Sequence, residues 1–565
     1  MNYLGISDFQ YNSGISLINE EGMLFSVNEE RLSRIKNDGG FPFLSLLELG
    51  KILDQDSSIK IDKICVSSIM NPPIFVRYFD FFRKLENGVR GGVDEGFTRY
   101  LSDFIHFNTQ LTTSSPGTLF GKITKLFLND SIRRKLPKYL EGVPLCFVEH
   151  HLAHAASAFY NSGFKEALCI TADEMGDGVS LSVNKCANRE IERIGFCPYE
   201  NSFGYFYRLI TEVLGFLPNR HEGKVMALAA WGNPHRVKHP FPFKKTDNGK
   251  VIYTGGFGIS EVKKLRRLLG QYSREDIASW LQHNCKEYFK SLVQKWMLET
   301  GLSNLVLAGG FFANIGVNQA LCELDSVKNF FVYPNMGDGG ISHGAALAIQ
   351  KPVPSRIPHL YWGIDYSDEE IGRALKKSGI SYRFCVDVET EAAKILAQGF
   401  TVARFKGRFE WGPRALGNRS ILYHAKDKSV NDWLNKKLRR SEFMPFAPVT
   451  MFEDVDEYYV CSDKAKLCAE FMTMSLACTE KMRQENPAAV HVDGTSRSQL
   501  IHQEANPDFY RLIKEYKRIT GLGCLLNTSF NMHEEPIVSS PDSAIEAFKI
   551  SGLDYLAIGN FLAGS

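Results

Sequence analysis

The feature that most constrains the fold is a weak internal duplication. Near the N-terminus, the runs YLGIS, SGISLI and MLFSV are short, apolar and separated by polar turns, which is typical of an antiparallel meander. A similar unit recurs as ALCITAD followed by GVSLSV. Both copies place an aspartate, Asp8 or Asp173, directly after an apolar strand. A repeated strand-turn-strand unit predicts two structurally related lobes.

Two such lobes facing a central cleft form the actin-like ATPase architecture, which we expect for residues 1–352. Residues 70–140, dense in Phe, Arg and Lys, are predicted to be a helical insertion between the two copies. The Pro-rich segment 351–360 predicts an interdomain linker. Residues 361–565 contain the apolar strands TVARFKG and GCLLNTSFN, each entering a polar loop, and predict a second α/β domain with its site at the strand ends.

Composition excludes several classes of function. The 565 residues carry a formal charge of +2, so nothing draws the whole chain to nucleic acid or to a membrane surface. Nowhere do about 18 apolar residues run together, and the start lacks the pattern of a signal peptide. The 12 cysteines are scattered without a CxxC pair. We therefore expect a cytoplasmic protein that binds neither membrane nor nucleic acid.

A candidate metal site begins with His150 and His154, four residues apart in EHHLAHAASAFY. On a helix both imidazoles project from one face, and the absence of an intervening Glu removes the general base of an HExxH peptidase. Asp173 and Asp338, each close to glycines, are candidate carboxylate ligands. This donor set suits zinc, manganese or ferrous iron. The alternative is that the histidines are hydrogen-bonded core residues and the aspartates form turns.

Two further segments predict contacts to a nucleotide or its phosphates. One is the AGGFFAN turn, with Gly309, Gly310 and Asn314. The other is RHEGKVMALA, with Glu222 and Lys224. A glycine pair is most often a simple turn, so the interpretation depends on both segments occurring together with the candidate metal site.

A second constellation is strongly basic and rich in glycine turns. Arg497 in HVDGTSR and Asn527 and Ser529 in LLNTSFN lie downstream of it. One interpretation is a solvated surface, but guanidinium groups beside glycine and proline favour a phosphate site, here for ATP and a small acyl phosphate. Nucleic-acid binding is less favoured because no exposed basic stripe is indicated. The basic residues are Arg404, Lys406, Arg408, Arg414, Arg419, Lys436, Lys437, Arg439 and Arg440.

The order of these segments resembles the NodU/CmcH-type O-carbamoyltransferases. The shared blocks are EERLSR with Lys36, HHLAHA, EGKVMALA, AGGFFAN, GDGG, GPRALGNRS, PFAPV, HVDGTSR and LLNTSFN followed by EPIV. The resemblance implies an actin-like N-terminal domain and a YrdC-like C-terminal domain. It also implies that carbamoyl phosphate and ATP give carbamoyl-adenylate and pyrophosphate, after which the carbamoyl group passes to a hydroxyl.

The resemblance also implies roles for individual residues. His150, His154, Asp173 and Asp338 correspond to metal ligands, with Fe²⁺ as the family expectation and Mg²⁺ accompanying ATP. A further set corresponds to contacts with the adenylate and carbamoyl phosphate, and substitution of Arg497 is expected to abolish adenylation. That set is Arg414, Arg419, Arg440, Arg497 and Ser529.

Two positions depart from the family pattern. Many members have His-Asp where this chain has Tyr11-Asn12, so no histidine base for the acceptor hydroxyl is implied there. Glu30, Lys36 or a metal-bound group is the suggested replacement. Members often carry an arginine where this chain has Met444, and Lys436 or Lys437 is the suggested substitute for that phosphate contact.

Two other enzyme classes share predicted domains with this chain: a tRNA threonylcarbamoyl-type enzyme shares both domain types, and an actin-like sugar kinase or ATPase shares one. A tRNA threonylcarbamoyl-type enzyme would need a basic tRNA-binding face, which the near-neutral charge disfavours. A sugar kinase or ATPase of the actin-like superfamily would need no second domain and would release ADP. A purely binding role fits poorly with so many charged groups beside glycine turns. The expected acceptor is a natural-product hydroxyl, and a homodimer is the default assembly.

Overall fold

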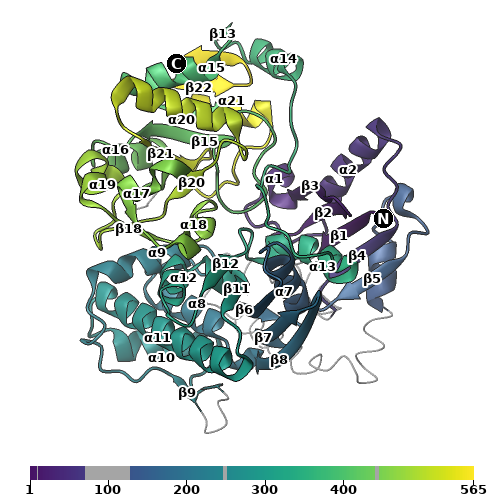
Figure 1. Ribbon diagram of the computed structural model, residues 1–565, viewed down its shortest axis with the longest axis vertical. Helices are drawn as coiled ribbons and strands as arrows, with labels where there is room; N and C mark the ends of the chain where they lie inside the picture. Colours follow the sequence, from purple (N-terminus) through teal and green to yellow (C-terminus); the bar gives the residue numbers. More distant parts are fainter. Residues whose placement is uncertain (9–10, 70–126, 246–250, 440–444, 565) are drawn as a thin grey trace. The chain divides into compact units, whose positions relative to one another are not determined.

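The computed structural model describes residues 1–8, 11–69, 127–245, 251–439 and 445–564, which form two compact units (Figure 1). The first comprises Met1–Met23 and Gly39–Arg356. The second comprises Leu24–Asp38 and Ile357–Ser565. The chain thus enters the second unit twice, once within a strand near the N-terminus and once within the Pro-rich segment 351–360.

The first unit contains two five-stranded sheets with the same topology. The orders are β3-β2-β1-β4-β5 and β8-β7-β6-β11-β12. In each sheet the first strand pairs antiparallel with the second, β1 with β2 and β6 with β7, and parallel with a later strand, β4 or β11. The strands are β1 (Tyr3–Ser7), β2 (Gly14–Asn19), β3 (Gly22–Asn28), β4 (Lys63–Ser67), β5 (Leu145–Val148), β6 (Glu166–Gly176), β7 (Val179–Ala187), β8 (Glu190–Pro198), β11 (Asn304–Ala308) and β12 (Asn329–Val332). The predicted duplication is confirmed.

Two equivalent helices join the repeats. α7 (His150–Tyr160) follows β5 and packs against β6, β7 and β11, whereas α13 (Ile341–Gln350) follows β12 and packs against β1, β2 and β4. The two helices also contact each other. A Cβ atom on Gly344 would lie only 1.8 Å from the carbonyl oxygen of Ala153, so this crossing requires glycine. This crossing therefore brings together the N-terminal halves of α7 and α13, which are far apart in the sequence.

The first unit contains further helices besides α7 and α13. The predicted insertion at residues 70–140 lies mostly outside the described residues, which resume at 127. Within the described ranges, no helix is both long and apolar enough to cross a membrane. These helices are α2 (Phe43–Gln55), α8 (Phe203–Val213), α9 (Glu222–Leu228), α10 (Gly258–Leu269), α11 (Arg274–Thr300) and α12 (Ile315–Cys322).

The second unit is α/β, as expected, and is built on a mixed eight-stranded sheet. Its order is β13-β23-β22-β14-β15-β21-β16-β20. β14, β15 and β21 form an antiparallel centre, while β22 and β20 add parallel pairs with β14 and β16. The strands are β13 (Tyr382–Phe384), β14 (Val402–Phe405), β15 (Arg419–His424), β16 (Pro448–Met451), β20 (Gln499–Ile501), β21 (Cys524–Ser529), β22 (Tyr555–Ile558) and β23 (Phe561–Gly564).

Helices and a small sheet complete the second unit. α15 (Val388–Ala397) and α20 (Pro507–Thr520) pack together over an apolar core that includes Val402, Leu422 and Phe509. The strands expected at TVARFKG and GCLLNTSFN are β14 and β21. The other elements are α1 (Glu29–Ser33), α14 (Asp368–Ser378), α16 (Val430–Lys437), α17 (Val455–Tyr458), α18 (Asp463–Ala469), α19 (Glu480–Glu485), α21 (Pro541–Ser551), β17 (Tyr459–Val460), β18 (Leu476–Cys478) and β19 (Thr495–Ser496).

Candidate active site

The histidine pair lies on the first turns of α7. The carboxylate of Glu149 caps this helix by accepting a hydrogen bond from the amide of Leu152 at 2.7 Å. Four-residue spacing then places His150 and His154 on one face, with the two Nε2 atoms 3.1 Å apart. The helix predicted from EHHLAHAASAFY is confirmed.

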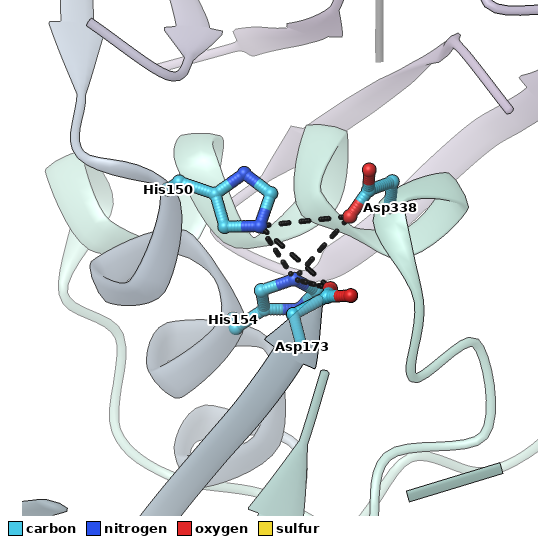
Figure 2. A group of neighbouring side chains, drawn as sticks. All are labelled: His150, His154, Asp173 and Asp338. Carbon is cyan, nitrogen blue, oxygen red and sulfur yellow. Dashed lines mark hydrogen bonds and ion pairs between the residues drawn. The ribbon is translucent and has the colours of Figure 1, made fainter. Parts of the chain in front are cut away.

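Two carboxylates from the other repeat complete the cluster (Figure 2). Asp173 on β6 lies 3.2 Å from His154 through Oδ2, and Asp338, before α13, lies 3.5 Å from His150 through Oδ1. One ligand atom from each of the four side chains can be chosen so that all lie within 4.8 Å of one another. The structure thus brings together the four residues that the sequence proposed as one donor set.

Neighbouring groups hold these side chains in place. Ser68 Oγ lies 3.1 Å from His150 Nδ1, and the amide of His150 donates to Asp177 at 2.9 Å. The amides of Glu174 and Gly310 donate to Asp173 at 2.7 and 3.2 Å. Such outer contacts fix ring orientation and leave the Nε2 atoms directed at the cluster.

The cluster shifts the pKa values of its own members. Burial disfavours the charged ring of His150, but Asp338 and Asp173 outweigh burial and raise its pKa to about 9. Burial and the charge of Asp173 raise the pKa of Asp338. Burial acts in the same upward direction on Asp173, but hydrogen bonds from His150 and His154 hold its pKa well below the usual range. With a pKa of about 9, the His150 ring carries a proton at neutral pH, and a metal ion would have to displace that proton to bind there.

The residues present fit a divalent metal ion. Asp338 Oδ1 is buried and has no hydrogen-bond partner among the described residues. At most one of the two facing imidazole Nε2 atoms needs to carry the proton of their 3.1 Å contact. A cation accepting lone pairs from two imidazoles and two carboxylates would satisfy all four groups.

The predicted AGGFFAN turn lies beside this cluster. Gly309 has φ of +102°, and a Cβ there would lie 2.1 Å from the carbonyl oxygen of Ala172. Gly310 orients Asp173, as described above. Asn314 caps α12 by accepting from Val317 at 3.1 Å and exchanges two hydrogen bonds with Gln282. Both ends of the Asn314 side-chain amide are therefore hydrogen-bonded within the protein. Its predicted contact to a nucleotide stays a prediction.

The other predicted residues of the first unit are partly buried. Glu222 at the start of α9 accepts from the amide of Asn219 at 2.6 Å, and burial raises its pKa to about 7. Lys224 on the same helix is buried. Tyr11 donates a hydrogen bond from its amide to Asp338 at 3.3 Å and one from its hydroxyl to the carbonyl of Asn219.

In the second unit, the loop 406–418 joins β14 to β15 and carries Arg414, with Arg419 at its end. Glu410 organises this loop: its Oε1 accepts from the amides of Leu416, Asn418 and Arg419 at 2.8, 2.7 and 3.2 Å. Glu410 is fully buried and is the sole acid between Arg404 and Arg419. A single acid within a run of basic residues is the sequence signal for this structural role, which the family motifs did not indicate.

Arg419 presents an unusual free edge. Its side chain is fully buried, its Nη1 donates to Lys406 O at 3.1 Å, and its guanidinium stacks 3.6 Å above the ring of Phe405. Nε and Nη2 have no hydrogen-bond partner among the described residues, nor does Nε of Arg414. Burial lowers the pKa of both arginines to about 10, so both remain cations at neutral pH.

The strand ends converge on the same loop. Asn527 on β21 donates to Ala415 O at 3.3 Å and to Gln499 Oε1 at 2.7 Å, and Gln499 donates to Leu416 O at 2.9 Å. Arg497 lies two residues before Gln499, and Ser529 ends β21 opposite Ser420. The structure thus groups Asn527 and Gln499 with residues 406–419, the arginine loop, which carries Arg414 and Arg419.

The remaining predicted residues divide into described and undescribed ones. Glu30 is buried on α1 and accepts from the amide of Asn37 at 2.8 Å, with Lys36 in the following turn; both belong to the second unit. Lys437 on α16 donates to Gly552 O at 2.7 Å. Arg440 and Met444 lie outside the described residues.

Comparison with known proteins identifies the class. The model described as Carbamoyltransferase N-terminus matches residues 2–347, and that described as Carbamoyltransferase C-terminus matches residues 393–564. The chain therefore belongs to the carbamoyltransferase family and is an enzyme that transfers carbamoyl groups.

Individual relatives extend this result. The chain is 32% identical to nodulation protein NolNO of Sinorhizobium fredii over 98% of its own length and 79% of that protein. It is 26% identical to the 3'-hydroxymethylcephem-O-carbamoyltransferase of Streptomyces clavuligerus over 60% of its length and 64% of that protein. A crystal structure of full-length HypF in its phosphate- and nucleotide-bound form matches with a TM-score of 0.35 and 14% identity, covering 62% of this chain and 55% of HypF.

Proposed function

We propose that this carbamoyltransferase is ATP-dependent and makes carbamoyl-adenylate before transferring the carbamoyl group to a hydroxyl of a small molecule. In the balanced scheme, water releases carbamate and phosphate from carbamoyl phosphate. A carbamate oxygen then attacks the α-phosphorus of ATP, and the bond to pyrophosphate breaks. Finally the acceptor oxygen attacks the carbamoyl carbon, AMP leaves, and the hydroxyl proton passes to a base.

The observation that carries the adenylation half is the guanidinium edge of Arg419, whose Nε and Nη2 find no hydrogen-bond partner among the residues that the structure describes. A buried cation with two free N–H donors is costly unless an anionic oxygen completes its shell, and phosphate oxygens match the guanidinium fork. Arg414 lies on the same loop, and its Nε also lacks a hydrogen-bond partner within the described part of the chain. These donors would stabilise charge that develops on phosphate oxygens while pyrophosphate or AMP leaves.

The four-residue cluster of the first unit supports the transfer half. We propose that His150, His154, Asp173 and Asp338 hold a divalent ion, with Fe²⁺ as the family expectation and Mg²⁺ accompanying ATP. Such an ion supplies Lewis-acid polarisation of an oxygen when bound. The chain's own groups orient the ligands: Ser68 holds the His150 ring, and the Gly310 amide holds Asp173.

The acceptor is proposed to be a natural-product hydroxyl. The similarity to a cephem O-carbamoyltransferase supports oxygen as the acceptor atom. The formal charge of +2 supports a small molecule over tRNA. Glu222 is a candidate proton acceptor, because burial brings its pKa to about 7, where a carboxylate is an effective base near neutral pH. A homodimer is the proposed assembly.

Pyrophosphate release tests the adenylation half. The wild type should release pyrophosphate from ATP only when carbamoyl phosphate is present, and Arg419→Met and Arg497→Ala should each lower the rate by about 100-fold or more, the usual scale for one electrostatic contact to the transition state. Arg518→Ala is the matched control, because Arg518 is 65% exposed and pairs with Glu515 on the same helix. Release of ADP in place of pyrophosphate would contradict the proposal.

A further inference from the structure

A short N-terminal segment belongs structurally to the second unit. Leu24–Asp38 is separated from the rest of that unit by more than 300 residues of chain, yet it groups with Ile357–Ser565. Its helix α1 carries Glu29, Glu30 and Arg31, and all three are buried. Burying a guanidinium group is unfavourable unless hydrogen bonds compensate. The hydrogen bonds of Arg31 therefore indicate which part of the second unit the segment holds in place.

Arg31 contacts the loop that carries the phosphate-site arginines. Its side chain is 2% exposed, and Nη2 donates to the carbonyl of Gly412 at 2.7 Å. A longer contact of 3.5 Å reaches the carbonyl of Glu410, and the guanidinium carbon lies 5.9 Å from the centre of the Phe409 ring. Arg31 therefore holds the backbone of residues 409–412 from the side of the N-terminal segment.

Further hydrogen bonds fasten the segment along its length. Arg408 donates to Leu24 O at 3.2 Å, and the amide of Ser26 donates to Trp362 O at 3.1 Å. Ser539 donates its hydroxyl to Arg31 O.

Arg34 is the next arginine of the segment, and it makes a different contact. It donates to Ile537 O at 2.7 Å and to Pro536 O at 2.9 Å. The side chain of Arg31 thus donates to the loop of Glu410 and Gly412, whereas the side chain of Arg34 donates to 536–537 and forms an ion pair with Glu535. The two arginines form a natural pair for comparison.

One residue, Glu410, connects Arg31 with Arg419. The backbone that Arg31 holds includes Glu410, whose carboxylate accepts the amides of Leu416, Asn418 and Arg419. Phe409 lies 5.9 Å from the guanidinium carbons of both Arg31 and Arg419. Displacement of residues 409–412 would therefore move the carboxylate that sets the start of β15.

We propose that Arg31 is a positioning residue for carbamoyl-adenylate formation: from the N-terminal segment, it fixes the loop that presents Arg414 and Arg419 to phosphate. The proposal rests on the proposed function for its catalytic consequence, but the mechanical coupling of Arg31 to residues 409–419 is independent of that function. An enzyme built this way has an adenylation unit that is incomplete without residues 24–38.

The test uses the full-length chain and amide hydrogen exchange. In Arg31→Met, we expect the amides of Leu416, Asn418 and Arg419 to exchange about tenfold faster or more, the size of one lost charge-assisted hydrogen bond. In Arg31→Lys, which keeps one donor for Gly412 O, protection should be partly restored. In Arg34→Met, the increase should be confined to residues 535–539.

Pyrophosphate release supplies the second readout. Arg31→Met should raise KM for ATP or lower kcat/KM by about tenfold or more, Arg31→Lys should recover part of the loss, and Arg34→Met should change it by less than about threefold. Unchanged exchange at residues 416–419 in both Arg31 variants would overturn the proposal, as would equal effects of Arg31→Met and Arg34→Met throughout the second unit. If the wild type released no pyrophosphate, the proposed function would fail, while the exchange comparison would still decide the coupling.

Discussion

The Nε2 atoms of His150 and His154 lie 3.1 Å apart, one helical turn from each other on α7. Their two carboxylate partners come from elsewhere in the duplicated fold: Asp173 follows the buried run 167–172 of β6, and Asp338 precedes α13. Because α7 and α13 cross in contact, residues separated by almost 190 positions share one cluster. This geometry leads to direct predictions about metal binding.

Removing one carboxylate should abolish tight metal binding. Asp338→Asn preserves the shape of the side chain but removes the negative charge that faces His150 at 3.5 Å. We expect metal content after dialysis to fall from about one equivalent to near zero, because neutral amide oxygen is a poor replacement for carboxylate in such a site. Elemental analysis checks this. His235→Ala, at an exposed histidine, should keep its metal, and full occupancy of the Asp338→Asn variant would refute the assignment.

Loss of the outer contact to His150 should weaken binding without eliminating it. In Ser68→Ala, the His150 ring loses its 3.1 Å partner at Nδ1 while all four ligands remain. Metal affinity should fall by about 10–100-fold, as is common for such outer partners. Competition titration with a chelator measures the change. Affinity equal to the wild type would show that packing alone orients the ring.

The helix crossing should tolerate no side chain at Gly344. A methyl group there would meet the backbone oxygen of Ala153 at 1.8 Å, so Gly344→Ala must separate α7 from α13. We expect the free energy of unfolding of the first unit to fall by about 1–3 kcal/mol or more. Gly223→Ala is the matched control, since nothing lies within 4 Å of a Cβ there and alanine favours helix α9. Chemical denaturation compares the two.

Glu410 should be essential for the conformation of the arginine loop. Glu410→Ala would leave the buried amides of Leu416, Asn418 and Arg419 without their acceptor. At about 1–3 kcal/mol for each unsatisfied buried group, a loss of several kcal/mol in the stability of the second unit is expected. Glu410→Gln retains one acceptor oxygen and should lose less. Equal stability of wild type and alanine variant in urea would contradict this role.

Buried His343 should make the first unit sensitive to acid. Its Nδ1 lies 2.8 Å from the hydroxyl of Tyr333, and burial lowers its pKa to about 3. In the unfolded chain its pKa returns to about 6.5, so between these values the unfolded state binds more protons. Its contribution to stability is therefore complete above pH 6.5 and falls by about 1.4 kcal/mol per pH unit as pH decreases toward 3.

The variant His343→Gln isolates this contribution. The free energy of unfolding, measured between pH 6.5 and 4.5, should depend less steeply on pH than in the wild type. His151, whose pKa is also lowered by burial, should maintain part of the slope. The exposed variant His235→Gln should leave the wild-type slope intact. An identical slope in His343→Gln would show that the ring titrates normally in the folded protein.

Much of the local structure followed from sequence. Short apolar runs separated by polar turns predicted the paired strands β1 and β2 and their repeat in β6 and β7, because such runs bounded by turns are typical of the strands of a meander. The four-residue spacing of His150 and His154 predicted their common helical face. The family motifs identified a carbamoyltransferase, which the comparisons confirm.

What the tertiary structure decided is which distant groups meet. The sequence by itself nominated Asp173 and Asp338 as carboxylate ligands because of their glycine neighbours, but it is the crossing of α7 and α13 that brings both to the histidines. It likewise nominated Glu30 in EERLSR, whereas the neighbouring Arg31 makes the contact to Gly412. A local sequence pattern indicates the periodicity and the secondary-structure propensity of a segment, and both depend on a few adjacent residues. Long-range contacts depend on the packing of whole elements, so the partners of a buried charge are known only once the chain is folded.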